Sequence, residues 1–189
     1  MLTAGILVVP KLVNLTSFLA QSIFYSGGTR ITTRNVRVHG SYNDWTLAND
    51  VAVIIINRVN YSNTIRNIGL ASGSNQYVGS WATASGFGKT SDSSGASSTM
   101  RHVNLQVITN DVCRRTYGNM IGSSIICVAT PNGRSTCGGD SGGPLAISNT
   151  LIGVLYLSVI VMGALVDTPP VSLESHPTTH GSDPSNLLT

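Results

Sequence analysis

Residues 137–144 read Cys-Gly-Gly-Asp-Ser-Gly-Gly-Pro, the most distinctive stretch of the chain. Four glycines flank Asp140 and Ser141, so the backbone can turn tightly there and approach a bound ligand closely. Such a turn also leaves backbone N–H groups free to face a developing negative charge. A glycine pair alone would indicate an ordinary turn in a β protein, so the interpretation depends on the surrounding sequence.

The composition around this loop favours an all-β protein. Charged residues make up 10% of the 189 residues, whereas Ser, Thr, Gly and Asn are abundant. The net charge of +3 has no basic cluster behind it, so we expect no nucleic-acid partner. Short β-branched runs between turn residues predict strands, and one polar segment predicts a helix. The predicted strands are 29–38, 51–56, 77–85, 103–107 and 125–128, and the predicted helix opens at 111–115 with Asn110 as its cap.

Several segments outside the loop, taken together with it, resemble the sequence of one known protein family. Residues 49–53 read Asn-Asp-Val-Ala-Val, and residues 85–88 read Ser-Gly-Phe-Gly. Together with the octapeptide, they resemble the Asn-Asp-Ile-Ala-Leu segment, the Ser-Gly-Trp-Gly crossover and the nucleophile loop of the chymotrypsin family of serine proteases. Segments 26–30 and 39–43 resemble digestive chymotrypsins of arthropods in particular. The resemblance implies a double antiparallel β-barrel of the trypsin type, with the active site between the barrels.

The resemblance also implies roles for individual residues. Ser141 would be the nucleophile and Asp50 the acid that orients a histidine, while the amides of Gly139 and Ser141 would form the oxyanion hole. Ser135, six residues before the nucleophile, would floor the specificity pocket, to which Gly138 belongs. A neutral floor cannot pair with a buried Lys or Arg side chain, so we expect a large apolar or aromatic side chain there.

The three cysteines fit the same resemblance. An odd number indicates either a free thiol or a missing partner. The resemblance implies a disulfide between Cys113 and Cys127 and leaves Cys137 unpaired. It implies no cofactor and no metal ion. Two sequons, at Asn14 and Asn60, suit an exported protein but also arise often by chance.

The resemblance fails at the catalytic histidine. In the family this residue follows a Leu-Thr-Ala-Ala strand end; residues 1–4, Met-Leu-Thr-Ala, match that approach, but Gly-Ile-Leu follows at 5–7. None of the four histidines lies between residues 4 and 38. His39 is expected at the barrel surface or rim and His102 on a strand of the second barrel. Without an imidazole the Ser141 hydroxyl keeps its proton, and loss of a triad costs roughly a million-fold in turnover in subtilisin.

Both ends of the chain depart from the family pattern. Residues 1–24 lack a basic opening and are interrupted by Pro10 and Lys11, so we do not expect a signal peptide. Residues 151–166 are apolar but fall short of the roughly 18–20 residues that span a bilayer, which disfavours a membrane anchor. We therefore expect aberrant ends at 1–24 and 155–189 around a partial protease domain at 25–154, with barrels at 25–89 and 100–154. The first strands, the final strand and the C-terminal helix would be missing.

A shifted reading frame is one hypothesis for the tail. Synonymous codons read across residue boundaries over 162–182 permit a peptide that resembles the end of a chymotrypsin, including a cysteine that could pair with Cys137. Sequencing the transcript tests this hypothesis.

These observations favour one function over two alternatives. The first is a secreted serine endopeptidase that cleaves protein or peptide substrates through an acyl-enzyme, inactive in this chain because the histidine is absent. The alternatives are a non-catalytic homologue that binds or regulates, and a membrane-tethered fragment. Because both ends depart together and Cys137 lacks a partner, the sequence favours damage over an evolved non-catalytic role.

Overall fold

Strands dominate the fold, which confirms the all-β class. The computed structural model describes residues 3–6, 15–19, 28–43, 45, 48–157 and 160–163, with side chains described for 28–43, 45 and 48–156. The elements in chain order are β1 (Thr3–Ile6), β2 (Leu15–Leu19), β3 (Thr29–Thr33), β4 (Val36–Val38), β5 (Ala52–Ile56), β6 (Gly69–Leu70), β7 (Trp81–Gly86), β8 (Arg101–Ile108), α1 (Asn110–Tyr117), η1 (Gly118–Met120), β9 (Ile125–Val128), η2 (Pro131–Gly133), β10 (Pro144–Ile147), β11 (Thr150–Leu157) and β12 (Ile160–Gly163).

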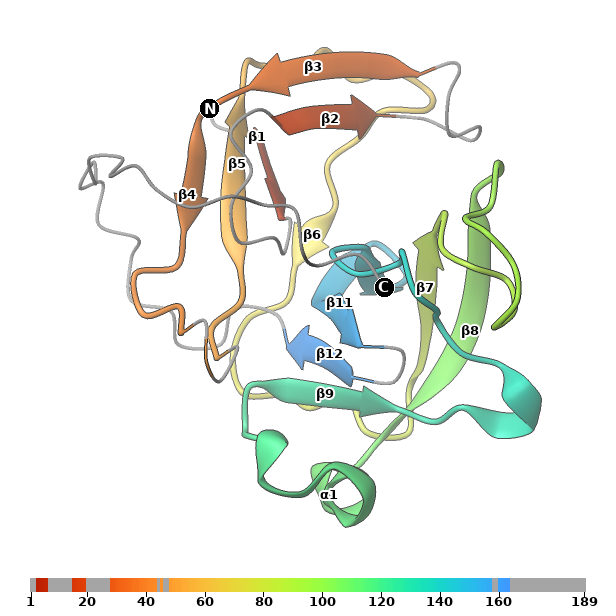
Figure 1. Cartoon of the computed structure of the whole chain (residues 1–189). Coiled ribbons are helices and arrows are strands. Elements are labelled where there is room, and N and C mark those ends of the chain that lie inside the picture. Colours follow the sequence, from red (N-terminus) through yellow and green to blue (C-terminus); the bar gives the residue numbers. More distant parts are fainter. Residues whose placement is uncertain are drawn as a thin grey trace.

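The first half of the chain forms two small antiparallel sheets. One has the strand order β1-β5-β4, and the other pairs β2 with β3 (Figure 1). Buried and half-buried residues alternate along β5, as expected for a strand with one face on a core. Ile54 and Ile56 are buried there, and Ile31 and Val36 pack against them. This half is open, because in the part of the chain that the structure describes β1 and β2 each pair on one side only.

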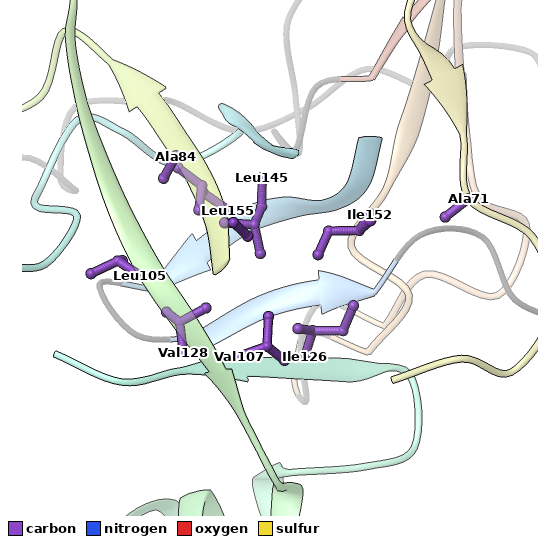
Figure 2. Close-up of a cluster of buried hydrophobic side chains, with 10 residues drawn as sticks. Ala71, Ala84, Leu105, Val107, Ile126, Val128, Leu145, Ile152 and Leu155 are labelled. Carbon is purple, nitrogen blue, oxygen red and sulfur yellow. The ribbon is translucent and has the colours of Figure 1, made fainter. Parts of the chain in front are cut away.

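The second half closes into a barrel. Its hydrogen-bonded strand order is β10-β7-β8-β9-β12-β11, and an additional pairing of β10 with β11 joins the two ends (Figure 1). Strand β6 lies outside this ring and pairs in parallel with β11. Figure 2 shows the labelled core side chains converging between the strands, among them Leu105, Leu145 and Ile152, which are 0% exposed. A well-filled core of this kind makes the second half a stable support for the loop at 137–144.

The connection between the two halves of the fold lies earlier in the sequence than residues 89–99, where the composition had led us to expect it. We expected the first barrel to reach residue 89, but β7 pairs with β8 along its length and belongs to the second barrel. The segment 87–100 is therefore a hairpin loop, crossed by a bridge between Lys89 and Ala96. The connection between the halves is instead the segment 57–68, between β5 and β6.

The second barrel also continues past residue 154, where we expected the aberrant tail to begin. Leu155 is 2% exposed and belongs to the main core. Strand β12 pairs with both β9 and β11 and therefore belongs to the ring of strands. Among the described residues, no helix is both long enough and apolar enough to cross a bilayer.

Local predictions were partly correct. The strand predicted at 125–128 is confirmed as β9. The helix is confirmed as α1, but its N-cap is Thr109, whose hydroxyl accepts from the Val112 amide at 3.3 Å. Asn110, the predicted cap, is the first helical residue, and its side-chain amide donates to the carbonyls of Gly122 and Ile125.

Candidate active site

The glycine-rich loop is fixed by backbone hydrogen bonds to β11. Gly142 N–H donates to the Leu155 carbonyl and Leu155 N–H donates to the Gly143 carbonyl, both at 2.8 Å. Gly139 and Gly142 have φ values of 97° and 83°, which favour glycine strongly. A Cβ at Gly143 would lie 2.8 Å from the Asp140 carbonyl oxygen, so the loop is also too tight there for a side chain.

Ser141 lies at the turn of this loop and is exposed. Its Oγ donates to the main-chain carbonyl of Tyr156 at 3.3 Å, so the hydroxyl proton is directed at a neutral amide oxygen. A carbonyl oxygen is too weak a base to accept that proton during attack on a substrate. The amides of Gly139 and Ser141 form no hydrogen bond within the described part of the chain, whereas the Asp140 amide donates to Cys137.

Asp50 lies just before β5 and is 7% exposed. Burial raises the pKa of its carboxyl group, because the charged form loses solvation. The next residue, Val51, accepts from the backbone N–H of His39, and Asn49 is held by its side-chain amide, which donates to the Ser41 carbonyl. The acid is therefore held in a well-ordered turn.

Tyr156 of β11 interacts with the Ser141 loop and with the disulfide cluster. Its carbonyl accepts from Ser141, and its phenol packs against the cluster around the Cys113–Cys127 disulfide. Burial raises the pKa of the Tyr156 phenol, and the negative charge of Asp50 raises it further, with a smaller contribution from Tyr42. Tyr156 therefore accepts the Ser141 hydrogen bond through its main chain, and its side chain experiences the charge of Asp50.

No described histidine completes a triad. His39 Nδ1 accepts from the Ser41 amide at 3.1 Å, and His102 is exposed on β8 opposite Ser85. Neither forms a hydrogen bond with Asp50 or Ser141 within the described part of the chain. His176 and His180 lie outside the described residues.

Asp140 is seated beneath two glycines at the end of β7. Its Oδ1 accepts from the Gly88 amide at 2.8 Å, and its Oδ2 accepts from the Cys137 amide at 3.0 Å. A Cβ at Gly88 would lie 2.6 Å from the Asp140 Cγ and Oδ1 atoms, and a Cβ at Gly86 would overlap Oδ1. The Ser-Gly-Phe-Gly segment therefore leaves room for this carboxylate, a role that sequence reasoning missed although two glycines at a strand end could have signalled it.

Ser135 lines a cavity of about 470 Å³ between the loop and the β7–β8 hairpin. Its hydroxyl donates to the Thr136 carbonyl. Charged side chains of both signs line the same cavity, namely Lys89, Asp92, Arg101 and Asp140. Gly138, which we expected beside Ser135 in the specificity pocket, is not among the residues that line this cavity.

The predicted disulfide between Cys113 and Cys127 is confirmed, with an S–S distance of 2.09 Å. It joins α1 to β9 and lies in a small core with Ile121 and Ile125. Cys137 is a free thiol of intermediate exposure. Tyr156, by contrast, was not predicted as part of the site, because it lies in the tail that we had set apart from the protease domain.

The comparison with protein families decides the identity of this arrangement. The family model described as trypsin matches residues 4–164, which includes both sheets of the first half and the closed barrel. The chain belongs to the trypsin family. The match is wider at both ends than the range of 25–154 that we had expected for the protease domain.

Named relatives of this trypsin-family chain are insect enzymes. It is 40% identical to trypsin delta of Drosophila melanogaster over 139 residues, which cover 71% of this chain and 54% of that protein. It is 37% identical to trypsin alpha-3 of Lucilia cuprina, covering 69% of this chain and 80% of that protein. The chain thus spans about half the length of the first of these relatives.

Solved structures agree with the trypsin-like fold. HL collagenase superposes with a TM-score of 0.72 at 33% identity, covering 80% of this chain and 71% of that chain. An inactivated protease paralogue of the scabies mite, S-D1, superposes with a TM-score of 0.69 at 21% identity, covering 77% of this chain and 69% of that chain, which supports the fold alone.

Proposed function

We propose that this trypsin-family chain represents a secreted serine endopeptidase whose turnover is abolished here by the missing histidine. Ser141 is the nucleophile, Asp50 the acid, and the amides of Gly139 and Ser141 the oxyanion hole for the acyl-enzyme reaction. One observation carries the proposal of inactivity. The Ser141 hydroxyl donates to the Tyr156 carbonyl, and among the described residues no imidazole is bonded to it or to Asp50.

The oxyanion hole is supported by the loop geometry. The neighbouring amides of Asp140, Gly142 and Gly143 all donate to carbonyls of the protein. The amides of Gly139 and Ser141 make no such bond within the described residues, so they remain available for a substrate oxygen.

We further propose that a complete enzyme of this type prefers a large apolar or aromatic side chain at the specificity pocket. Ser135 is uncharged, and its hydroxyl is bonded to a carbonyl of its own loop.

The extracellular location is supported by the Cys113–Cys127 disulfide, because such bonds persist mainly in oxidising compartments. The sources of the named relatives agree with this view, since both are insect trypsins.

Labelling with a fluorophosphonate tests the proposed inactivity. The purified full chain and its Ser141→Ala variant are incubated with the probe, and the covalent adduct is followed over time. We expect the two proteins to label equally slowly, because the serine is not activated. Labelling of the parent that depends on Ser141 and proceeds at a rate typical of a protease would refute the proposal.

A further inference from the structure

The connection between the two halves contains a glycosylation signal in a suitable structural setting. Residues 60–62 read Asn-Tyr-Ser, and the middle residue is not proline. They lie in the segment 57–68, which joins β5 to β6 and contains no helix or strand. A glycan needs this kind of position, because its bulk cannot be accommodated inside a sheet or core.

The side chains of the signal face solvent. Asn60, Tyr61 and Ser62 are all exposed, and Tyr61 retains 57% of its accessible surface. No hydrogen bond holds the Asn60 side chain within the described part of the chain. In Figure 1 the connection runs at the end of the view where β3 lies, whereas α1 lies at the opposite end. None of the residues 60–62 lines the cavity beside the glycine-rich loop.

The backbone immediately after Asn60 forms a defined turn. Ser62 Oγ accepts from the amides of Thr64 and Ile65, and the Ser62 amide donates to the Ile65 carbonyl at 2.9 Å. The chain thus bends back after the signal and leaves Asn60 on the outer approach to the turn. The other signal offers no comparable setting, since Thr16 is part of β2, where it pairs with Thr32 of β3, and Asn14 lies outside the described residues.

We propose that Asn60 is a site of N-linked glycosylation when the chain enters the secretory route, an inference that rests on the proposed extracellular location. In the transfer, Asn60 Nδ2 bonds to the anomeric carbon of a polyprenyl-pyrophosphate-linked oligosaccharide. The bond from that carbon to the pyrophosphate oxygen breaks, the amide loses one proton, and polyprenyl pyrophosphate leaves with the electron pair. The attached glycan would cover exposed apolar side chains of the same segment, Tyr61 and Ile68.

The test expresses the full chain in insect cells behind a cleavable heterologous signal peptide. Lumenal and secreted protein are collected, treated with peptide N-glycosidase or left untreated, and cut after arginine. Cleavage after Arg58 and Arg66 releases the peptide 59–66, which carries Asn60 alone of the two signals. We expect this peptide to appear after glycosidase treatment with Asn60 converted to aspartate. We also expect the Asn60→Gln variant to migrate faster on a gel than the parent by one glycan.

Matched variants separate the signal from the fold. Asn63→Gln changes an exposed asparagine of the same turn outside any signal and should leave the glycan in place, as should Ser62→Thr, which keeps the hydroxyl. Protein that is protected inside the lumen but carries an unmodified 59–66 peptide would overturn the proposal, whether or not it folds, because transfer occurs on the nascent chain. Since the signal peptide is supplied, neither the activity of Ser141 nor the natural route of export affects this result. Export of the chain without the added signal tests the proposed location separately.

Discussion

Three residues define the candidate active site of this trypsin-family chain. Ser141, the proposed nucleophile, lies on a tight loop and its hydroxyl donates to the backbone carbonyl of Tyr156, while the carboxyl group of Asp50, the proposed acid, is buried. A buried carboxylate without a cationic neighbour costs stability, because desolvation is not offset by a favourable charge interaction.

The raised pKa of Asp50 predicts that the fold gains stability in acid. Folding favours the protonated carboxyl group, so its contribution is fully present below the ordinary pKa of 3.8 and is lost as pH rises through the raised value of the folded state. Urea unfolding midpoints between pH 4 and 8 should therefore fall less steeply with pH in Asp50→Asn than in the parent. Asp92→Asn, at an exposed position, serves as the control and should behave as the parent does. Parallel pH profiles of the parent and Asp50→Asn would contradict this prediction.

At position 88, a side chain larger than that of glycine is expected to clash with the Asp140 carboxyl group and destabilise the fold. A Cβ there would lie 2.6 Å from the Asp140 carboxyl group, whose Oδ1 accepts from the Gly88 amide. Gly88→Ala should therefore reduce the free energy of unfolding by about 1–3 kcal/mol, as other overpacked sites do. Gly95→Ala is the matched control, because no heavy atom lies within 4 Å of its Cβ position. Equal urea midpoints for the two variants would show that Asp140 is not seated as described.

At the scale of elements, the sequence predicted strands better than their connections. The strand 125–128 was correct because this apolar, largely β-branched run is too short for a helix and is bounded by turn residues. The run 29–38 divides at Arg34 and Asn35, where the Asn35 amide donates to the Thr33 hydroxyl and forms a local turn that a β-branched pattern does not reveal. The loop at 89–99 was misassigned because composition identifies a loop but not which strands pair across it. Tyr77 has a φ of 55° and cannot continue an extended strand, so β7 begins at Trp81, later than predicted.

The N-terminal cap of helix α1 makes a testable contribution to the stability of the fold. Thr109 Oγ1 accepts from the Val112 amide, a capping bond whose loss typically costs about 1 kcal/mol. Thr109→Ala should lower the free energy of unfolding by about that amount. Thr130 precedes η2 and forms no side-chain capping bond, so Thr130→Ala isolates the effect of the bond from the change of residue type. If both variants unfold at the same urea concentration, the Thr109 cap contributes nothing measurable.

At the scale of the whole molecule, the described strands of the two halves pair differently. The second half closes its ring through β10 and β11 and carries Ser141 beside that closure. The first half carries Asp50 just before β5, in a sheet whose edge strands β1 and β4 pair on one side only within the described residues. The candidate site could be predicted in its chemistry, because motifs mark Ser141 and Asp50, but the contact that occupies the serine comes from Tyr156, and no local pattern connects a loop to a distant strand.

The register of β1 predicts where a histidine would restore the missing step. Ile6, the last residue of β1, is paired with Val53 of β5, three residues after Asp50, so a side chain introduced there begins about 10 Å along the strand from the acid. Ile6→His should increase fluorophosphonate labelling of Ser141 at least about tenfold, a modest share of the 10²–10⁴ that general base catalysis supplies. The increase should rise with pH as the imidazole loses its proton. It should also vanish in Ile6→His combined with Ser141→Ala and weaken when Asp50→Asn is added. A folded Ile6→His protein that labels no faster than the parent would contradict this prediction. It would show that the backbone of the first half does not bring β1 to the serine. More than one side chain would then separate this chain from an active protease.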